Sequence, residues 1–140
     1  MPSLIEDLTA TRLADFLQAT RPEALCAIPI HIAHRDELRT RPCIVIDTPE
    51  SRPVIAMPNT AKVRVNVHLF SQIDDTPADT HATWAGVLSS MLSDRSALRV
   101  WLDSDGFVLH DLIARDSMTA PDETRGRETT LSYEAVVFAM

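Results

Sequence analysis

Apolar and polar residues alternate along residues 62–72, which have the sequence KVRVNVHLFSQ. Every second position is apolar: Val63, Val65, Val67 and Leu69. This is the period of a β-strand with one buried face, so a long strand is predicted here. Its second face carries Arg64, Asn66, His68 and Phe70. Arginine and aromatic side chains are enriched in protein interfaces, so this face is either a partner surface or an ordinary solvated one.

Two segments have the spacing of amphipathic helices. The first spans about residues 4–20, with Ser3 and Glu6 as a capping box and Arg21-Pro22 as its end. The second follows Thr76 as N-cap and Pro77 as first helical residue. Its apolar stripe consists of Trp84, Val87, Leu88, Met91 and Leu92. Gly86 interrupts this helix at a cost of about 1 kcal/mol relative to alanine, which allows a neighbouring element to approach closely.

Further strands are predicted at residues 25–32 and 43–48, the second almost wholly apolar and therefore buried on both faces. Three prolines mark residues 49–59 as a connection. Residues 98–114 read as a hairpin turning at Ser104-Asp105-Gly106, and residues 129–140 as a final strand. The polar segment 115–128 between them is predicted to be a long loop. Strands joined by short turns predict an α+β fold, a mostly antiparallel sheet with two main helices packed on one face, formed by residues 1–140 as one domain.

The overall charge and composition narrow the classes of function. The 140 residues have a net charge of −7, and Lys62 is the single lysine among 13 basic residues. An acidic chain is a poor binder of nucleic acid, because phosphate contacts need clustered bases. No apolar run reaches the roughly 20 residues that span a bilayer, and the N-terminus lacks signal-peptide features, so a cytosolic protein is expected. Cys26 and Cys43 are expected to be buried thiols.

Candidate chemistry is sparse. His31 and His34 form an H-x-x-H pattern near Asp36 and Glu37, but a zinc site needs three or four convergent ligands, so a surface loop is the preferred interpretation. A second acidic cluster lies where the second helix begins: Asp74, Asp75 and Asp79. These carboxylates are expected to complement the helix dipole, with His81 close enough for an ion pair. With three glycines in the chain, no phosphate-binding loop is present, and no cofactor is expected.

From Lys62 onward the chain resembles the tail terminator, or tail completion, proteins of tailed bacteriophages, such as the lambda terminator. The likeness rests on the "VNVHLFSQ" strand, the helix "ATWAGVLSSMLSD", the segment "LRVWLDSDG" and the final "TTLSYEAVVF" strand. It is a pattern of element lengths without catalytic signature residues. Head–tail connector proteins of similar size share much of it.

The resemblance implies a virion structural protein and not an enzyme, assembled in the host cytoplasm and located at the tail and neck. Such proteins form hexameric rings that cap the tail tube, stop its polymerisation and offer a surface for joining the head. The implied partners are other copies of the chain, the tube protein and, in addition, sheath and neck proteins. DNA would pass through the lumen without specific binding.

On this interpretation the second side of the long strand faces a neighbouring subunit or the lumen. The segment 115–128 would contact the tube or another partner through Arg115, Asp116, Asp122, Glu123, Arg125 and Arg127. Three alternatives stay open: a neck adaptor, a ligand-binding module acting as a monomer or dimer, and a metal-dependent hydrolase using the histidine and aspartate clusters.

Overall fold

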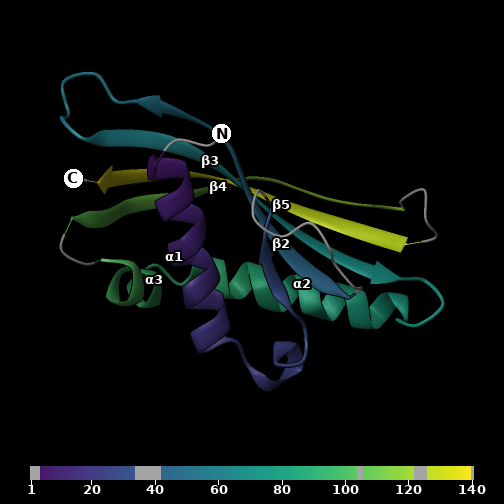
Figure 1. The fold of residues 1–140 in the computed structure, drawn as a ribbon. Helices are drawn as coiled ribbons and strands as arrows, with labels where there is room; N and C mark the ends of the chain where they lie inside the picture. The colour runs from purple at the N-terminus through teal and green to yellow at the C-terminus, as the bar shows by residue number, and fades with distance from the viewer. Residues whose placement is uncertain (1–3, 34–41, 104–105, 122–125, 140) are drawn as a thin grey trace.

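A computed structural model describes residues 4–33, 42–103, 106–121 and 126–139. Along the chain the elements are α1 (Leu4–Thr20), the 3-10 turn η1 (Glu23–Leu25), β1 (Ile30–Ile32), β2 (Cys43–Pro53), β3 (Thr60–Gln72), α2 (Ala78–Ser93), α3 (Arg95–Leu102), β4 (Phe107–Pro121) and β5 (Gly126–Ala139). The strands form one sheet in the order β1-β2-β3-β5-β4, and the helices lie on one side of it (Figure 1).

The sheet is antiparallel except for its first pair. β1 runs parallel to β2, whereas the β2–β3, β3–β5 and β5–β4 pairs are antiparallel. The long strand β3 lies at the centre and pairs along its whole length with β5, from Thr60 opposite Phe138 to Gln72 opposite Gly126. The predicted α+β class, with two main helices packed on one face of a mostly antiparallel sheet, is confirmed.

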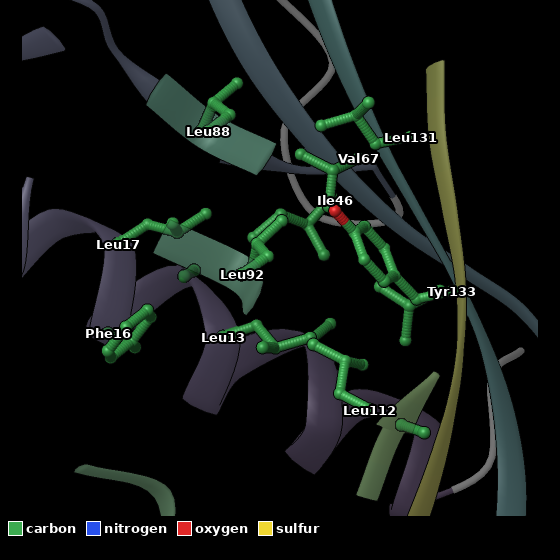
Figure 2. Packing of buried hydrophobic residues seen from close by; sticks show 14 of the residues in the cluster. Leu13, Phe16, Leu17, Ile46, Val67, Leu88, Leu92, Leu112, Leu131 and Tyr133 are labelled. Carbon is green, nitrogen blue, oxygen red and sulfur yellow. The ribbon is translucent and has the colours of Figure 1, made fainter. Parts of the chain in front are cut away.

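The core lies between the sheet and the helices. Leu13, Phe16 and Leu17 of α1 project toward it, and Leu88 and Leu92 reach it from α2 (Figure 2). The sheet contributes the alternating residues of β3, all at most 1% exposed: Val63, Val65, Val67 and Leu69. Fully burying one such aliphatic side chain stabilises the fold by roughly 1.5–3 kcal/mol. The predicted alternation of β3 is therefore confirmed, and its even-numbered side chains lie on the face away from the helices.

Two predicted strand assignments near the start of the sheet were inaccurate. Segment 25–32 forms a strand only at Ile30–Ile32, because Pro29 has no N–H to donate and η1 precedes it. In contrast, β2 continues to Pro53 through the segment predicted to be a connection. A register shift between Asp47 and Glu50 places Thr48 and Pro49 in a bulge, which accommodates the proline without breaking the strand.

The predicted first arm of the 98–114 hairpin was wrong, because residues 95–102 form α3. The Asp94 side chain accepts a hydrogen bond from the Ala97 N–H at 3.2 Å and caps this helix. Leu98 is fully buried on the inner side of α3. Apolar residues at helical spacing after an N-cap aspartate favour a helix over the strand suggested by their β-branched and aromatic neighbours.

The predicted long loop at 115–128 was also wrong. β4 extends through Pro121 and β5 begins at Gly126, so most of the segment belongs to a two-stranded ribbon that is paired from Asp116–Ser132 to Pro121–Arg127, beyond a bulge at Arg115. Pairing of the strand backbones satisfies the polar groups of a sequence that lacks apolar alternation. Two smaller differences concern the N-cap of α2 and the exposure of Cys26, whereas Cys43 is buried as predicted. Pro77 is the N-cap of α2 where Thr76 was expected, and Cys26 is exposed while Cys43 is buried, both as free thiols.

Candidate functional site

The candidate site is the open face of the sheet, defined here by the even-numbered residues of β3 and their partners on β5. The four residues predicted to share one face do so: Arg64, Asn66, His68 and Phe70. Across the ladder they stand opposite Glu134, Ser132, Thr130 and Glu128. Directly paired residues of an antiparallel sheet share a face, so the register creates a continuous polar surface.

His68 is the most constrained side chain of this open face. Its Nδ1 lies 2.9 Å from Oε1 of Glu128 and 3.1 Å from Oγ1 of Thr130. The Phe70 ring stacks on the imidazole with centroids 5.9 Å apart. Next along β3, the Asn66 side-chain Oδ1 accepts a hydrogen bond from the Ser132 hydroxyl of β5 at 2.9 Å. These contacts hold the side chains in fixed positions, which suits a protein-contact surface.

A cluster of arginines surrounds Glu134, whose side chain is only 18% exposed. Arg115 Nη2 lies 3.0 Å and Arg52 Nη2 3.9 Å from its carboxylate oxygens. Arg115 is the extra residue of a bulge between Ala114 and Asp116, and the bulge aims its side chain onto the open face. Arg64 pairs with Glu50 at 3.6 Å on the other side.

Together these side chains line a shallow hollow of about 570 Å³. Its outer arginines, Arg52, Arg64 and Arg115, keep more than half of their side chains exposed. Guanidinium groups in such positions retain N–H donors for bidentate contacts with carboxylates of a partner. The open face is therefore equipped for charge-assisted contacts between proteins.

The predicted contact residues of segment 115–128 separate into three groups. Arg115 and Asp116 lie on β4 beside the hollow. Arg127 Nη1 donates to the Thr76 carbonyl at 2.5 Å and ties β5 to the start of α2, an internal role that the sequence did not indicate. The rest lie outside the described residues: Asp122, Glu123 and Arg125. For all of them, a role in partner binding stays a prediction.

A buried hydrogen-bond network around His81 was missed by sequence reasoning. Ser71 Oγ lies 2.6 Å from Nδ1, and Thr129 Oγ1 lies 2.8 Å from Nε2. The Thr119 hydroxyl extends the network to Thr129 at 2.7 Å. Burial, and then the nearby charge of Arg127, lower the pKa of His81, which favours the neutral ring.

In the part of the chain that the structure describes, the His81 ring points into the sheet. It contacts Ser71 and Thr129 there and not the aspartate cluster with which an ion pair was expected. The Ser71–His81 distance is that of a nucleophile and its base. However, Ser71 is fully buried and the second ring nitrogen meets a threonine hydroxyl instead of a carboxylate. The arrangement therefore joins β3, α2 and β5, and a substrate has no access to Ser71 in this conformation.

The metal hypothesis gains no support from the part of the chain that the structure describes, where no group of three or more histidine, cysteine, aspartate or glutamate side chains converges. Three members of the H-x-x-H segment lie outside the described residues: His34, Asp36 and Glu37. Among the described helices, none combines the length and apolarity needed to cross a membrane.

Comparison with known proteins adds to this picture at the level of the fold. No protein-family model matches the chain, and no curated protein matches it by sequence. Among solved structures, a chain of the virion of a native gene transfer agent particle matches with a TM-score of 0.71 and 15% identity, covering 98% of this chain and 100% of its own length. A second structure, whose name states no function, matches with a TM-score of 0.51 and 13% identity over 98% of this chain and 94% of its own. The two proteins share this fold from end to end.

Proposed function

We propose that this chain is a structural protein of a tailed-phage-like particle, in which it acts as a tail terminator. Six copies form a ring on the end of the tail tube, stop its polymerisation and present a surface for joining the head. The observation that carries the proposal is the similarity in fold to a chain of a gene transfer agent virion, which covers 98% of this chain and 100% of that one. The resemblance of the strand and helix plan to tail terminators supports the more specific role.

The physical properties of the chain are consistent with a ring of this kind. A closed ring uses heterologous contacts, so each subunit needs two different complementary patches. The open face supplies one polar patch, and the helix layer on the opposite side of the sheet supplies a surface of a different character. A net charge of −7 keeps the lumen from holding DNA tightly as it passes.

The native mass of the purified protein tests this proposal. It is measured alone and after mixing with the tube protein encoded by the neighbouring gene. A mass of six subunits, either free or only on the tube, supports the terminator role. A monomer or dimer that ignores the tube protein refutes it, and a ring that binds the portal side of the neck but not the tube would assign the adaptor role instead.

Variants of the open face test where the contact lies. Arg64→Glu and Phe70→Asp are expected to weaken assembly while leaving a folded monomer, because both side chains lie on the side of β3 away from the core. Lys62→Glu changes charge to the same extent on the same strand and maps how far the contact extends. Normal assembly of Arg64→Glu and Phe70→Asp would exclude the open face as an interface.

A further inference from the structure

The turn between β2 and β3 presents apolar side chains to solvent. Ile55 is 93% exposed and Met57 46% exposed. Residues at the tips of hairpins are usually polar or glycine, because nothing covers them. A turn of the sequence Val-Ile-Ala-Met, residues 54–57, therefore leaves apolar surface to be covered by something outside the subunit.

The backbone of this turn is fixed. The Met57 N–H donates to the Val54 carbonyl at 3.2 Å, and the Val54 N–H donates to the Thr60 carbonyl at 2.9 Å. Ala56 has φ of 71° and Asn59 has φ of 56°, in a region that residues other than glycine rarely adopt. Such conformations persist where the surrounding structure determines them, and in this turn they accompany an Ile55 side chain that is almost fully exposed.

The helix layer contains an open groove with a largely apolar lining. It encloses about 690 Å³ between the end of α1 and the middle of α2, lined chiefly by Phe16, Pro22, Gly86, Val87 and Met91. A Cβ built on Gly86 would meet nothing within 4 Å, so no neighbour within the subunit explains a glycine inside this helix. The close approach expected from the sequence at this position is therefore available to an element from outside.

The turn cannot fill the groove of its own subunit. Met57 lines a hollow with Ile5, at the N-terminal end of α1, whereas the groove lies by Phe16 and Thr20 near its C-terminal end. Eleven residues of helix separate Ile5 from Phe16, a rise of about 17 Å. Figure 1 shows the β2–β3 turn and the lower end of α1 on opposite sides of the molecule. The two features can meet only between molecules.

Charge also matches the turn to the groove. Arg52 stands directly opposite Lys62 just below the turn, and both are exposed. Within the subunit Arg52 lies 3.9 Å from Glu134, a long contact that leaves the arginine side chain 73% exposed, so the basic pair can meet further acidic groups. The groove is bordered by Asp94, and residues 73–94 contain four aspartates and no lysine or arginine.

We propose that the apolar turn at residues 54–57 docks into the groove between α1 and α2 of a second copy of this chain. Ile55 inserts beside Gly86, and the basic pair below the turn lies near Asp94. Since turn and groove are different surfaces, the contact is head-to-tail and repeats from copy to copy, as a ring requires. This contact deepens the proposed function and rests on it, because it extends the proposed interface of the open face, whose hollow Arg52 and Lys62 also line, to the apolar turn.

Filling the groove is the sharpest test. Gly86→Leu places a side chain in open space, so the monomer is expected to fold, while the groove is occupied. Ala78→Leu makes a similar change at an exposed position of α2, two turns away and outside the groove, and is the matched control. On the turn, Ile55→Asp is matched by Ile73→Asp, which replaces another exposed isoleucine just beyond the opposite end of β3.

In native mass and sedimentation measurements, with circular dichroism as the check of folding, Gly86→Leu and Ile55→Asp are expected to raise the dissociation constant of the assembly about 10- to 100-fold. Both variants remove the burial of Ile55 from the contact, Gly86→Leu by filling the groove and Ile55→Asp by replacing the side chain, and the loss of one buried aliphatic side chain has an effect of this size. The two controls are expected to assemble as the wild type does. Assembly of the groove and turn variants at wild-type concentrations would overturn the proposal.

Disulfide cross-linking tests the contact directly, both in the free protein and in protein bound to tail tubes. In a Cys26→Ser background, a protein carrying Ile55→Cys is mixed with one carrying Ser90→Cys, and a disulfide-linked dimer is expected only in the mixture. Ile73→Cys replaces Ile55→Cys in the control and is expected to give no dimer. A wild-type ring without the cross-link refutes the docking contact alone, whereas a wild-type protein that stays monomeric with the tube protein present refutes the ring and the contact together.

Discussion

Replacing His81 by leucine tests whether the buried network holds α2 to the sheet. In the native structure the two ring nitrogens meet the hydroxyls of Ser71 and Thr129, at 2.6 and 2.8 Å. Leucine fills much of the same space but offers neither hydrogen bond. The Ser71 hydroxyl is fully buried and loses this partner, whereas Thr129 keeps its contact with Thr119 at 2.7 Å.

The expected loss of stability follows from these contacts. A buried hydroxyl left without its partner costs about 1–3 kcal/mol, and the lost bond to Thr129 adds about 1 kcal/mol. His81→Leu is therefore expected to lower the free energy of unfolding by about 2–4 kcal/mol. Removing the stranded hydroxyl in the double variant His81→Leu/Ser71→Ala should recover a large part of this loss, because two apolar partners leave no polar group unsatisfied.

The same network makes stability depend on pH. Burial and Arg127 lower the pKa of His81 in the folded state below its ordinary value of 6.5. Above pH 6.5 the ring is neutral in both states and its full contribution is present. As the pH falls below 6.5 the unfolded state binds the proton first, so stability is lost until the pH reaches the lowered pKa of the folded state.

Urea unfolding at matched protein concentration, at pH 7.5 and pH 5, measures both effects. The difference in unfolding free energy between wild type and His81→Leu is expected to shrink at pH 5, and using the difference removes the contributions of the other histidines. A difference that is equal at both pH values would refute the buried neutral state of His81. A His81→Leu protein as stable as the wild type at pH 7.5 would refute the network itself.

Five further substitutions, two of them combined in one double-mutant cycle, address the remaining features of the fold. Gly106→Ala is expected to destabilise the protein by about 1–2 kcal/mol in urea unfolding, because φ is 86° at this glycine. Gly86→Ala should instead stabilise the protein by up to about 1 kcal/mol, because alanine has the higher helix propensity. Equal effects of the two substitutions would contradict a left-handed backbone at Gly106 and a helical one at Gly86. Leu98→Ala is expected to cost about 2–5 kcal/mol, since this side chain of α3 is fully buried, and a loss below 1 kcal/mol would contradict the packing of α3. A double-mutant cycle on Arg115→Ala and Glu134→Gln should give a coupling no larger than about 1 kcal/mol that weakens with added salt, because the Arg115 side chain is 57% exposed.

The central part of the fold could be predicted because its signals are local. Strict alternation in β3 identified the buried face, and the stripe on α2 identified the helix that covers it. The errors arose where two local signals competed. Residues 95–102 contain strand-forming side chains but follow an aspartate cap, and the cap with helical spacing prevailed. Residues 115–121 have no apolar period, and only pairing with β5 makes them a strand.

The candidate site was predictable in its residues but not in its contacts. Alternation placed Arg64 and His68 on one face, whereas the partners Glu134 and Glu128 come from a strand more than 55 positions further along the chain. The His81 network is likewise assembled from β3, α2 and β5, so no spacing in the sequence indicates it. One signal in the sequence does indicate that His81 is buried. This histidine precedes the apolar stripe of α2, and a helix position flanked by core residues is itself often buried.

Alternate residues of β3 belong to the core and to the open face. Its odd-numbered side chains are at most 1% exposed from Val63 to Leu69 and stabilise the fold, and its even-numbered side chains make the ion pairs and hydrogen bonds of the open face. Because the period is two, neighbouring substitutions should fail in different ways: Val65→Glu by unfolding and Arg64→Glu by loss of assembly from a folded subunit. The β2–β3 turn continues this strand to an apolar tip, so one hairpin carries the core, the polar face and the proposed docking element. In the proposed ring, this hairpin would fix how the surfaces for neighbouring copies are oriented relative to the core, as a closed ring of constant geometry requires.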